Sequence, residues 1–577
     1  MSTKSRTLET DGVRVAIEGC GHGTLDAIYA SVARASKARG WDGVDLLIIG
    51  GDFEAVRNAA DLSVMSVPAK YRELGDFPAY YSGEKTAPYL TIFITGNHEA
   101  SSYLWELYYG GWVAPNMYYL GPANVLRFGP LRIAGMSGIW KGFDYRKPHH
   151  ERLPFSQDDI KSFYHVREID IRKLLLLREQ VDVGLSHDWP RAIEKHGDAA
   201  ALWRMKPDFR QESIDGKLGN PAAEYVLDRL RPAYWFSAHM HCKFTAIKTH
   251  KPPSTEPIQS ETSVKETPAP ISEPEQATGN PDEIDLDDED DGPDAGDTHN
   301  AEEPVTSAPQ PPASGVADDL RAQLPASFAA PVEQGPKLNP GQPVPSSITN
   351  TTTRFLALDK CLPGRKFIQL CTLEPLDPSQ LSLYPPSSPR APGNRSPRGR
   401  GKRSPTPSGN RYTLQYDPEW LAITRVFAKG LVIGDPSAAV PPDLGEAAYA
   451  PLIDAERAWV DEHIVRAGKL AVPDNFEITA PPHQAGMPES VPHQPDEYTN
   501  PQTAAFCELV GVENLWDASA EERAERKARG PPPSSGGDRG GDRRGGFRGR
   551  GGRGGGFGRG RGFSRGRGRG GGRGGWH

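Results

Sequence analysis

The chain has 577 residues, enough for three or four domains, but 62 glycines, 55 prolines and a mean hydropathy of -0.58 exclude a packed core along its whole length. Five scattered cysteines argue against a disulfide framework and for a reducing compartment. No apolar run reaches the roughly 18 residues of a membrane span, so we expect no membrane association and no secretion. The net charge of -8 averages segments of opposite sign and identifies no partner.

The first part of the chain is the best organised. Residues 12–246 alternate short apolar runs with amphipathic stretches, a pattern typical of strands and helices layered about a sheet. Residues 247–350 are rich in Pro, Ser, Glu and Thr and contain an acidic run without Lys or Arg, which predicts a disordered acidic insertion. Two strand-like runs follow, 354-RFLALDK-360 and 365-RKFIQLCTLE-374. We therefore expect residues 351–374 to complete the first domain.

The rest of the chain changes character three times. Residues 375–411 are rich in Ser, Pro and Arg and indicate a low-complexity basic linker. The stretches 417-DPEWLAITRVFAKGL-431 and 454-DAERAWVDEHIVRAGKL-470 have the acidic starts and basic ends of helices, so we expect a small, mainly helical C-terminal domain over 412–527. Residues 528–577 are mostly Arg and Gly with scattered aromatics, which predicts a disordered cationic tail.

Five apolar runs each end in a turn that holds a potential metal ligand. In layered α/β folds the carboxyl ends of strands face the ligand crevice, so such turns bring distant residues together. In chain order, the runs and their turns are 13-VRVAIEG-19 before Cys20 and His22, 44-VDLLIIG-50 before Asp52, 89-YLTIFITG-96 before Asn97 and His98, 181-VDVGLS-186 before His187, and 233-AYWFSA-238 before His239 and His241.

These donors suit a dinuclear site. Two metal ions about 3.5 to 4 Å apart need a carboxylate that bridges them, with imidazole, amide or thiolate donors around it. Asp52 is the acid in these turns best placed to bridge. His239 and His241 alternate along what we expect to be an extended segment, so two neighbouring metals would each take one of them.

The five turns resemble the calcineurin-like metallophosphoesterases, whose pattern is Asp-x-His, Gly-Asp, Gly-Asn-His, a lone His and Gly-His-x-His. All five blocks stand here in order, with Cys20 in place of the first aspartate and Ala238 in place of the last glycine. Cysteine in the first block is typical of one branch, the RNA lariat debranching enzymes. The stretches 50-GGDFEAVRN-58, 96-GNHEAS-101 and 184-GLSHDWPR-191 are similar to that family too.

The resemblance implies a fold and a set of ligands. The fold would be α/β, a layered β-sandwich flanked by helices, with the small helical C-terminal domain and long disordered segments. A thiolate donor suits Zn²⁺ or Fe²⁺ better than Mg²⁺ or Ca²⁺, so we expect two divalent ions, Fe²⁺ and/or Zn²⁺, with Mn²⁺ supporting activity. One metal would be held by Cys20, His22, Asp52 and His241, the other by Asp52, Asn97, His187 and His239, and His98 would be the catalytic residue.

The activity that the resemblance implies is hydrolysis of the 2′–5′ phosphodiester at the branch point of excised intron lariat RNA. It would give linear RNA for turnover after splicing, as part of mRNA processing. A hydroxide that bridges the metals would attack phosphorus, and His98 would stabilise the developing charge or protonate the departing 2′ oxygen.

By resemblance, residues 137–167 are the lariat-recognition segment. The segment mixes aromatic side chains with cations, which together suit unpaired bases and phosphates. An ordinary solvated loop packed by its own aromatics is the alternative. The residues we expect to contact RNA are Trp140, Lys141, Tyr145, Arg146 and Lys147.

Other functions stay open at this point. The same site would also serve another phosphoester, such as a phosphoprotein or a cyclic nucleotide. An inactive phosphoesterase domain could act as an RNA-binding scaffold, although every ligand position holds a competent donor. Activity on 2′–5′ branched RNA separates these hypotheses.

Partners and location rest on composition. Branched intron RNA is the expected substrate, and the Arg-Gly tail is expected to bind RNA non-specifically, with a merely solubilising role as the alternative. The basic run 398-RGRGKR-403 favours the nucleus, and shuttling to the cytoplasm stays open. The sequence identifies no protein partner.

Overall fold

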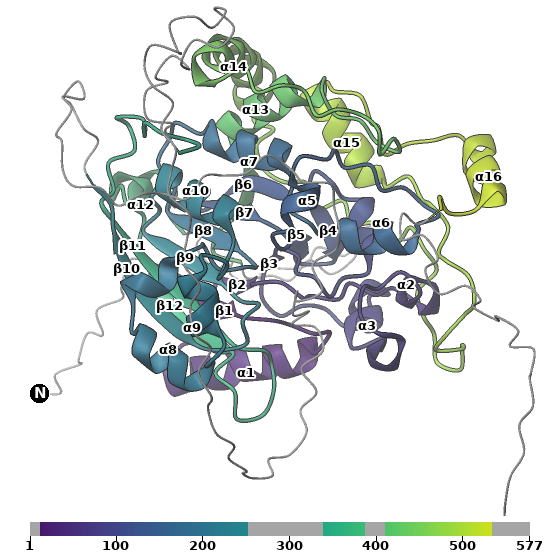
Figure 1. Cartoon of the computed structure of the whole chain (residues 1–577), viewed down its shortest axis with the longest axis horizontal. Helices are drawn as coiled ribbons and strands as arrows, with labels where there is room; N and C mark the ends of the chain where they lie inside the picture. Colours follow the sequence, from purple (N-terminus) through teal and green to yellow (C-terminus); the bar gives the residue numbers. More distant parts are fainter. Residues whose placement is uncertain (1–11, 252–338, 387–409, 534–577) are drawn as a thin grey trace, which may run out of the picture. The chain divides into compact units, whose positions relative to one another are not determined.

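The computed structural model of the chain describes residues 12–251, 339–386 and 410–533. The acidic run at 282–303, the basic run at 398–403 and the predicted tail from 534 onward lie outside these ranges. Two stacked β-sheets form the centre of the fold, with helices on both sides (Figure 1). No helix in the described ranges is both long and apolar enough to cross a membrane.

The first sheet has six strands in the order β12-β1-β2-β3-β5-β4. The inner strands β1, β2, β3 and β5 run parallel, while β12 and β4 pair antiparallel at the two edges. The strands are β1 (Val13–Glu18), β2 (Leu46–Ile49), β3 (Thr91–Phe93), β4 (Gly111–Ala114), β5 (Met117–Tyr119) and β12 (Ile368–Leu373).

The second sheet has seven strands in the order β10-β11-β9-β8-β7-β6-β13. Strands β11, β9, β8 and β7 run parallel, and β10, β6 and β13 pair antiparallel with their neighbours. The strands are β6 (Ala123–Phe128), β7 (Leu131–Met136), β8 (Val183–Ser186), β9 (Tyr234–Ser237), β10 (Phe244–Thr249), β11 (Thr352–Ala357) and β13 (Leu414–Tyr416).

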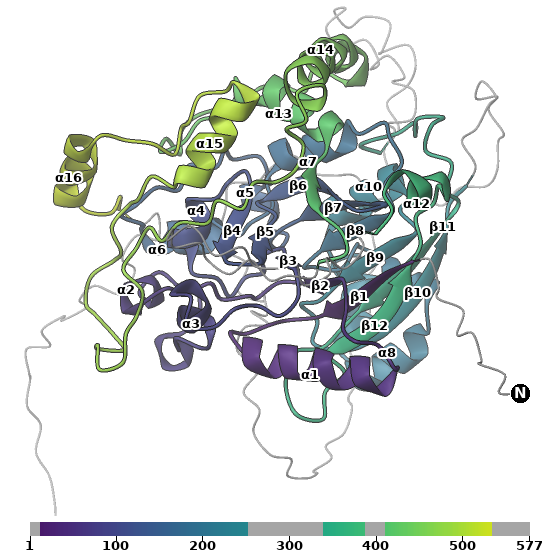
Figure 2. The ribbon, with the colours of Figure 1, turned by 180° about the vertical axis from the view of Figure 1, so that it is seen from behind.

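Helices cover the outer faces of both sheets. The long helix α1 packs against β12 of the first sheet, whereas α7 and α10 pack against the second (Figure 2). The helices of this part are α1 (Leu25–Ala38), α2 (Ala59–Leu62), η1 (Ala69–Tyr71), α3 (Phe77–Tyr81), α4 (Ser101–Trp105), α5 (Gly142–Tyr145), α6 (Gln157–Ser162), α7 (Glu168–Leu175), η2 (Ile193–His196), α8 (Ala199–Met205), α9 (Phe209–Ile214), α10 (Pro221–Leu230) and α12 (Ser379–Leu383).

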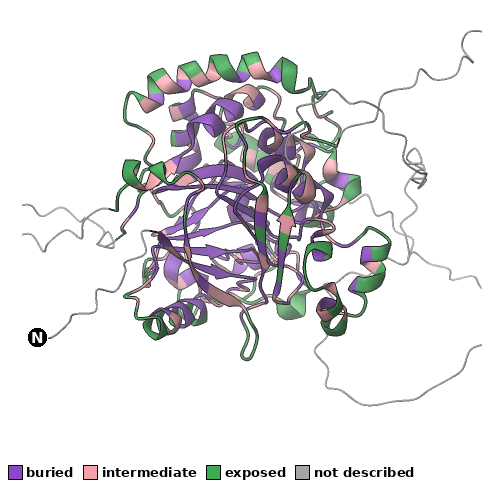
Figure 3. Cartoon of the chain, turned by 90° about the vertical axis from the view of Figure 1, so that its left-hand side faces the viewer, coloured by how far each residue is buried: buried purple, intermediate pink, exposed green. Residues whose placement is uncertain are grey.

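The core follows from the two-residue period of the strands. In β1, Val15 and Ile17 point into the cluster between the sheets, and Ala16 points to the opposite face, into the cluster beneath α1. In β2, Leu46 and Ile48 repeat this alternation with Leu47 and Ile49 on the opposite face. Because both faces are covered, β2 is apolar and buried throughout, and β1 departs from an apolar sequence only at Arg14 and Glu18. Figure 3 shows the strands at the centre of the molecule as mostly buried.

The C-terminal part is helical after its first strand. Pro418 and Asp417 start α13 in the usual way, since proline tolerates the first turn and the Asp417 carboxylate caps the Trp420 N–H. The helices are α13 (Pro418–Ala428), α14 (Glu446–Val460), the π-helical turn η5 (Asp461–Val465), α15 (Pro501–Val510) and α16 (Ala520–Arg529).

Several elements differ from the sequence prediction. The predicted helix at 454–470 starts at Glu446, because Pro451 is accommodated inside α14 and does not end it. Packed structure is present before residue 351: Ile348 is fully buried, and the Arg229 guanidinium donates to the carbonyl of Gly341. Strand β13 joins the second sheet through β6, so the C-terminal part begins inside the sandwich. The domain boundaries themselves stay predictions.

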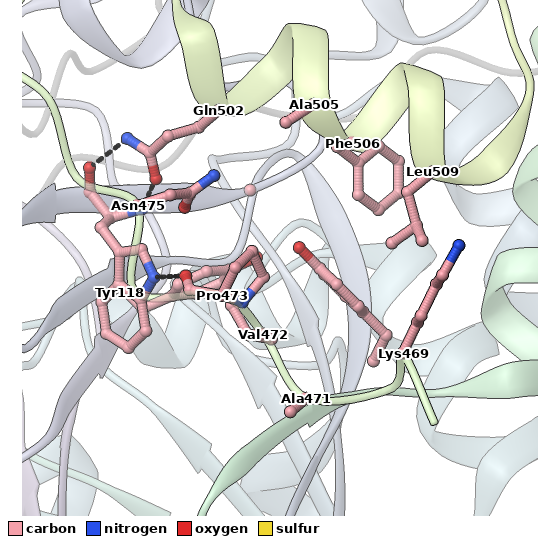
Figure 4. A pocket seen from close by; sticks show the side chains of 14 residues that line it. Tyr118, Lys469, Ala471, Val472, Pro473, Asn475, Gln502, Ala505, Phe506 and Leu509 are labelled. Atoms are coloured by element: carbon pink, nitrogen blue, oxygen red, sulfur yellow. Dashed lines mark hydrogen bonds between the residues drawn. The ribbon is translucent and has the colours of Figure 1, made fainter. Parts of the chain in front are cut away.

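The C-terminal part closes one side of the sandwich. The Gln502 side-chain amide accepts the backbone N–H of Trp112 at 2.7 Å and donates to its carbonyl at 2.8 Å. These bonds pair backbone groups that the edge strand β4 would otherwise leave without partners. The Trp112 indole N–H donates to the Pro473 carbonyl at 2.7 Å. A cavity of about 310 Å³ remains at this junction, with Tyr118 and Phe506 among its walls (Figure 4).

Candidate metal centre

The five predicted turns follow five strands of the two sheets. Strands β1, β2 and β3 of the first sheet and β8 and β9 of the second all end next to a predicted ligand. Four of the predicted ligands form one compact group whose donor atoms lie within 4.8 Å of one another. That group is Cys20, His22, Asp52 and His241, the set predicted for the first metal.

Asp52 lies at the centre of the predicted ligands. One carboxylate oxygen is 3.6 Å from Nε2 of His22, and the other is 3.4 Å from Nε2 of His187. The oxygen on the His187 side also accepts the backbone N–H of Asn97 at 3.0 Å. The two oxygens of one carboxylate therefore face histidines of the two predicted metal sets, as a bridging ligand requires.

The remaining histidines group as the two predicted sets require. The His187 and His239 rings have centroids 5.0 Å apart, and those of His22 and His241 are 5.7 Å apart. The backbone N–H of His239 lies 3.3 Å from the Cys20 sulfur. All seven predicted ligands are therefore neighbours, and which metal each one holds stays a prediction.

The ligand turns share an unusual backbone conformation. His22, Asp52, His239 and His241 adopt positive φ values of 41°, 45°, 60° and 46°, a region that is uncommon for residues other than glycine, although Asn, Asp and His enter it more often than most. Such conformations cost of order 1–3 kcal/mol each and cluster where function requires them. The strain is offset by the tight packing of the turns, and it turns each side chain toward the common centre.

One expectation about the last turn is wrong. His239 and His241 do not alternate along an extended segment: the chain bends at both residues, and the Met240 N–H bonds the Ala238 carbonyl at 2.7 Å. Left-handed backbone at both positions directs the rings to different neighbours, with His239 beside His187 and His241 beside His22. The division between two metals therefore depends on bends and not on a strand.

Two carboxylates cross-link the second and third turns. Buried Glu99 accepts the backbone N–H groups of Phe53 and Glu54, each at 2.9 Å. In return, Asp52 accepts the backbone N–H of Asn97 and of His98 at 3.0 and 3.1 Å. Each turn thus supplies the carboxylate that orders the backbone of the other.

The electrostatics of the site favour a cation. Burial would raise the pKa of Asp52, but the surrounding imidazoles, led by His187, lower it well below the usual value. Burial lowers the pKa of His187, and it lowers that of His241 to about 2, so these rings are neutral donors at pH 7. Burial and the charge of Asp52 raise the pKa of the Cys20 thiol, which a bound metal ion would reverse.

The donor atoms of the site fit metal ions. Nε2 of His22, His187 and His241 is buried in each case and makes no hydrogen bond within the described residues. A Cβ at Gly96 would lie 2.0 Å from Asp52 Oδ1 and 2.5 Å from His187 Nε2. Buried imidazole nitrogens without hydrogen-bond partners, around a space that even a methyl group would fill, are what a metal site requires.

Two acidic residues of the site escape the sequence prediction. Glu54 lies 3.1 Å from Nδ1 of His22, on the ring edge opposite the nitrogen that faces Asp52. The Glu54, His22 and His98 donors form a second compact group. Glu18, at the end of β1, is fully buried, and the charge of Asp52 adds to burial in raising its pKa. The only available signal was their position within the ligand turns.

The predicted recognition segment lies beside the site. The backbone N–H of Trp140 donates to the carboxylate of Asp188, the residue after His187, at 3.4 Å. The ring centroids of Trp140 and Tyr145 are 4.7 Å apart. Arg146 and Lys147 are exposed, and Lys141 is half-buried. All five residues predicted to contact RNA therefore lie together in or just before and after α5. Their contact with RNA stays a prediction.

Fold and site together define the class of the protein. Two stacked mixed sheets carry five ligand turns at the carboxyl ends of their strands. The family model described as calcineurin-like phosphoesterase matches residues 13–243, and phosphoesterases of this class use a dinuclear metal site. The chain is a metallophosphoesterase, and the predicted fold class is confirmed.

Comparison with known proteins narrows the class to one family. The family model for the lariat debranching enzyme C-terminal domain matches residues 350–515. The chain is 38% identical to the lariat debranching enzyme of Schizosaccharomyces pombe, over 90% of this chain and 98% of the relative. It is 36% identical to the human enzyme, over 87% of this chain and 69% of the human one. It is 35% identical to the Arabidopsis thaliana enzyme, over 88% of each chain. The chain belongs to the lariat debranching enzyme family.

Proposed function

We propose that the chain hydrolyses the 2′–5′ phosphodiester at the branch point of excised intron lariat RNA. The products are linear RNA with a free 2′-hydroxyl and a 5′-phosphate at the former branch. The proposal is carried by one observation: a thiolate donor, Cys20, lies within the compact ligand group of a chain that matches lariat debranching enzymes over most of its length.

The proposed cofactors are two divalent ions, Fe²⁺ and/or Zn²⁺, with Mn²⁺ as a substitute. Bound metals would lower the pKa of a water molecule and neutralise charge on the phosphate. Asp52 holds the two halves of the ligand set at a fixed separation, because each of its oxygens faces one half. Cys20 favours softer metals over Mg²⁺.

The open side of the centre is where the phosphate would enter. Cys20, Asp52, Asn97 and His187 are buried, whereas His98 is half-buried and its neighbour His22 is partly exposed. The His98 and His22 ring centroids are 5.1 Å apart. His98 is therefore the residue that we propose donates a proton to the departing 2′ oxygen, or donates a hydrogen bond to the charged phosphoryl oxygen.

RNA recognition is assigned to the segment 137–167. The aromatic pair Trp140 and Tyr145 offers faces to unpaired bases, and the cations beside it meet phosphates. We further propose a nuclear location and non-specific RNA binding by the Arg-Gly tail. The composition of the tail supports the last point, since flexible guanidinium groups neutralise phosphates.

The test is cleavage of a synthetic branched RNA by protein reconstituted separately with Fe²⁺, Zn²⁺ and Mn²⁺. We expect only the 2′–5′ bond to break, and the activity to disappear in Asn97→Ala and His98→Ala variants. A linear 3′–5′ RNA is the control. Binding without cleavage under every metal would overturn the proposal in favour of a scaffold, and cleavage of linear RNA would remove the specificity assigned to residues 137–167.

A further inference from the structure

A buried polar cluster is formed by residues that follow the second and third ligand turns in the chain. Arg57, five residues after Asp52, is completely buried and bonds Asp61 through Nε and Nη2 at 2.8 and 3.0 Å. Its Nη1 donates to Glu106 at 2.7 Å. Asp61 also accepts the Ser102 hydroxyl at 2.6 Å. The cluster therefore joins the turn that carries Asp52 to the α4 region, which follows the turn that carries Asn97.

Residues of the C-terminal part complete this cluster. The Thr479 hydroxyl accepts from Arg57 Nη1 at 2.9 Å and donates to Glu106 Oε2 at 2.8 Å. The Asn500 amide donates to the same Glu106 oxygen at 3.2 Å. We call Arg57, Asp61, Glu106, Thr479 and Asn500 the latch. Both side-chain donors to Glu106 Oε2 come from residues more than 370 positions away in the sequence.

Charge balance makes the latch depend on the C-terminal part. Arg57 is one guanidinium between two buried carboxylates, those of Asp61 and Glu106. Among the residues that the structure describes, only Thr479 and Asn500 donate to the second oxygen of Glu106, and a buried carboxylate without enough donors is destabilising. Without the C-terminal part, the Glu106 carboxylate therefore lacks hydrogen-bond donors for one of its two oxygens.

The backbone is fixed at the same place. The Tyr81 hydroxyl accepts the N–H groups of Thr479 and Ala480 at 2.8 and 3.0 Å. The carbonyl of Arg57 accepts the His483 N–H at 2.9 Å, and the Asn58 amide donates to the Pro481 carbonyl at 2.7 Å. Residues 479–483 thus lie along the end of the turn whose beginning holds the bridging carboxylate.

We propose that the latch sets the distance between the turn of Asp52 and the turn of Asn97, so that Thr479 and Asn500 are positioning residues for the metal centre. Asp52 and Asn97 are both predicted ligands of the second metal, and of these two only Asp52 is also a predicted ligand of the first. Loosening the latch therefore lowers the affinity for the second metal ion before it lowers the affinity for the first. The inference rests on the ligand set of the proposed function, but it concerns metal retention and not cleavage.

The test is titration of metal-free protein with Mn²⁺, followed by electron paramagnetic resonance of the coupled pair. Thr479→Val keeps the shape of the side chain and removes the hydroxyl, whereas Thr479→Ser keeps the hydroxyl. We expect Val to weaken the second Mn²⁺ about tenfold and to reduce the coupled signal, with the first Mn²⁺ unchanged and Ser close to wild type. Asn500→Ser is the second variant, since serine still caps α15 but cannot reach Glu106 as the amide does.

Thr353→Val is the matched control. Thr353 is fully buried, whereas Thr479 is half-buried. The Thr353 hydroxyl donates to the Pro232 carbonyl at 2.6 Å, at the amino end of β11, opposite the strand ends that the ligand turns follow. The Thr353→Val variant should lose about as much thermal stability as Thr479→Val and still bind Mn²⁺ at both sites. Full Mn²⁺ binding by Thr479→Val and Asn500→Ser, at a stability no higher than the control, would overturn the proposal. Wild-type protein that binds two Mn²⁺ without cleaving branched RNA would refute the proposed function alone.

Discussion

The ligand turns and the segment 137–167 are neighbouring irregular regions that satisfy their polar groups in opposite ways. In the turns, Nε2 of His22, His187 and His241 is buried without a hydrogen bond among the described residues. In the segment, the charges pair with one another: Asp144 with His165 at 2.6 Å, and Arg167 with Glu151. The turns are complete only with an external cation, whereas the segment holds its own shape.

This difference predicts that metal content and RNA affinity can be damaged separately. A change in the turns should empty the metal centre and leave the segment folded. A change in the buried ion pairs of the segment should weaken RNA binding and leave the metals in place. The predictions below test that separation.

The largest effect is expected from Gly96→Ala. The added methyl would lie 2.0 Å from Asp52 Oδ1 and 2.5 Å from His187 Nε2, so neither side chain can keep its place. We expect loss of bound metal and of measurable cleavage, checked by elemental analysis and by branched-RNA assay. Gly142→Ala is the control, because its methyl meets only Trp140 at 3.9 Å and should leave metal content unchanged. Equal metal content in the two variants would contradict the assigned site.

Arg167→Met should give the reverse pattern. Arg167 is 1% exposed and also bonds the carbonyls of Asp144 and Ser162, so its removal leaves buried Glu151 without its cation. We expect a loss of roughly 3–5 kcal/mol in the free energy of unfolding and a higher KM for branched RNA, with metal content retained. Denaturant unfolding and steady-state kinetics measure both. Arg172→Met breaks a pair within one helix turn with Glu168, whose two side chains are 13% and 21% exposed, and should cost less, about 1 kcal/mol or below.

Much of the metal centre could be predicted from the sequence, because its signals are local. Each ligand follows an apolar run, and all five runs form strands that end at one site. The left-handed backbone of His239 and His241 could not be predicted, since these residue types seldom adopt it and packing imposes it. Glu99 was visible in the third turn, but its role depends on reaching Phe53 across the fold.

The C-terminal part was harder to predict, for the same physical reason. Strand β13 has three residues, Leu414–Tyr416, too few for their apolar–polar–apolar alternation to predict a strand, and its pairing with β6 makes it one. Helix α14 contains Pro451, which a sequence pattern treats as a boundary. Arg57 bonds Asp61, four residues further along the chain, and Thr479, more than 400 residues further along. The sequence spacing suggests only the contact with Asp61.

The start of α13 holds a buried ion pair, Asp417 with Arg132, that can be compared with the buried ion pairs of the segment 137–167. Asp417 caps α13 and bonds Arg132 at 2.8 and 2.7 Å; burial alone would raise its pKa, but Arg132 lowers it to about 2. Because the pKa falls on folding, the pair stabilises the protein above about pH 4, and this contribution is lost as pH falls toward 2. Asp417→Asn, which keeps the cap, should therefore cost about 2 kcal/mol at pH 7 and less at pH 3.

Urea unfolding of wild type and Asp417→Asn at pH 7 and pH 3 measures this effect. A difference in unfolding free energy that is the same at both pH values would mean that the carboxylate charge contributes nothing. A difference that grows at pH 3 would mean that folding raises the pKa of Asp417 instead of lowering it. Either result would separate this contact from the ion pairs of the segment.

The smallest effect is expected at Glu54. This residue lies within the ligand turns, but its carboxylate is paired with another side chain of the protein, as the charges of the segment 137–167 are. Its carboxylate holds Nδ1 of His22 at 3.1 Å and so directs Nε2 toward Asp52. Partners of this kind orient a metal ligand and typically change affinity 10–100-fold when removed. We expect Glu54→Ala to weaken the first Mn²⁺ about tenfold, and Glu54→Gln to weaken it less, because an amide oxygen still accepts from Nδ1. Equal binding by both variants would show that the metal alone orients His22, and that the turns need no internal partner there.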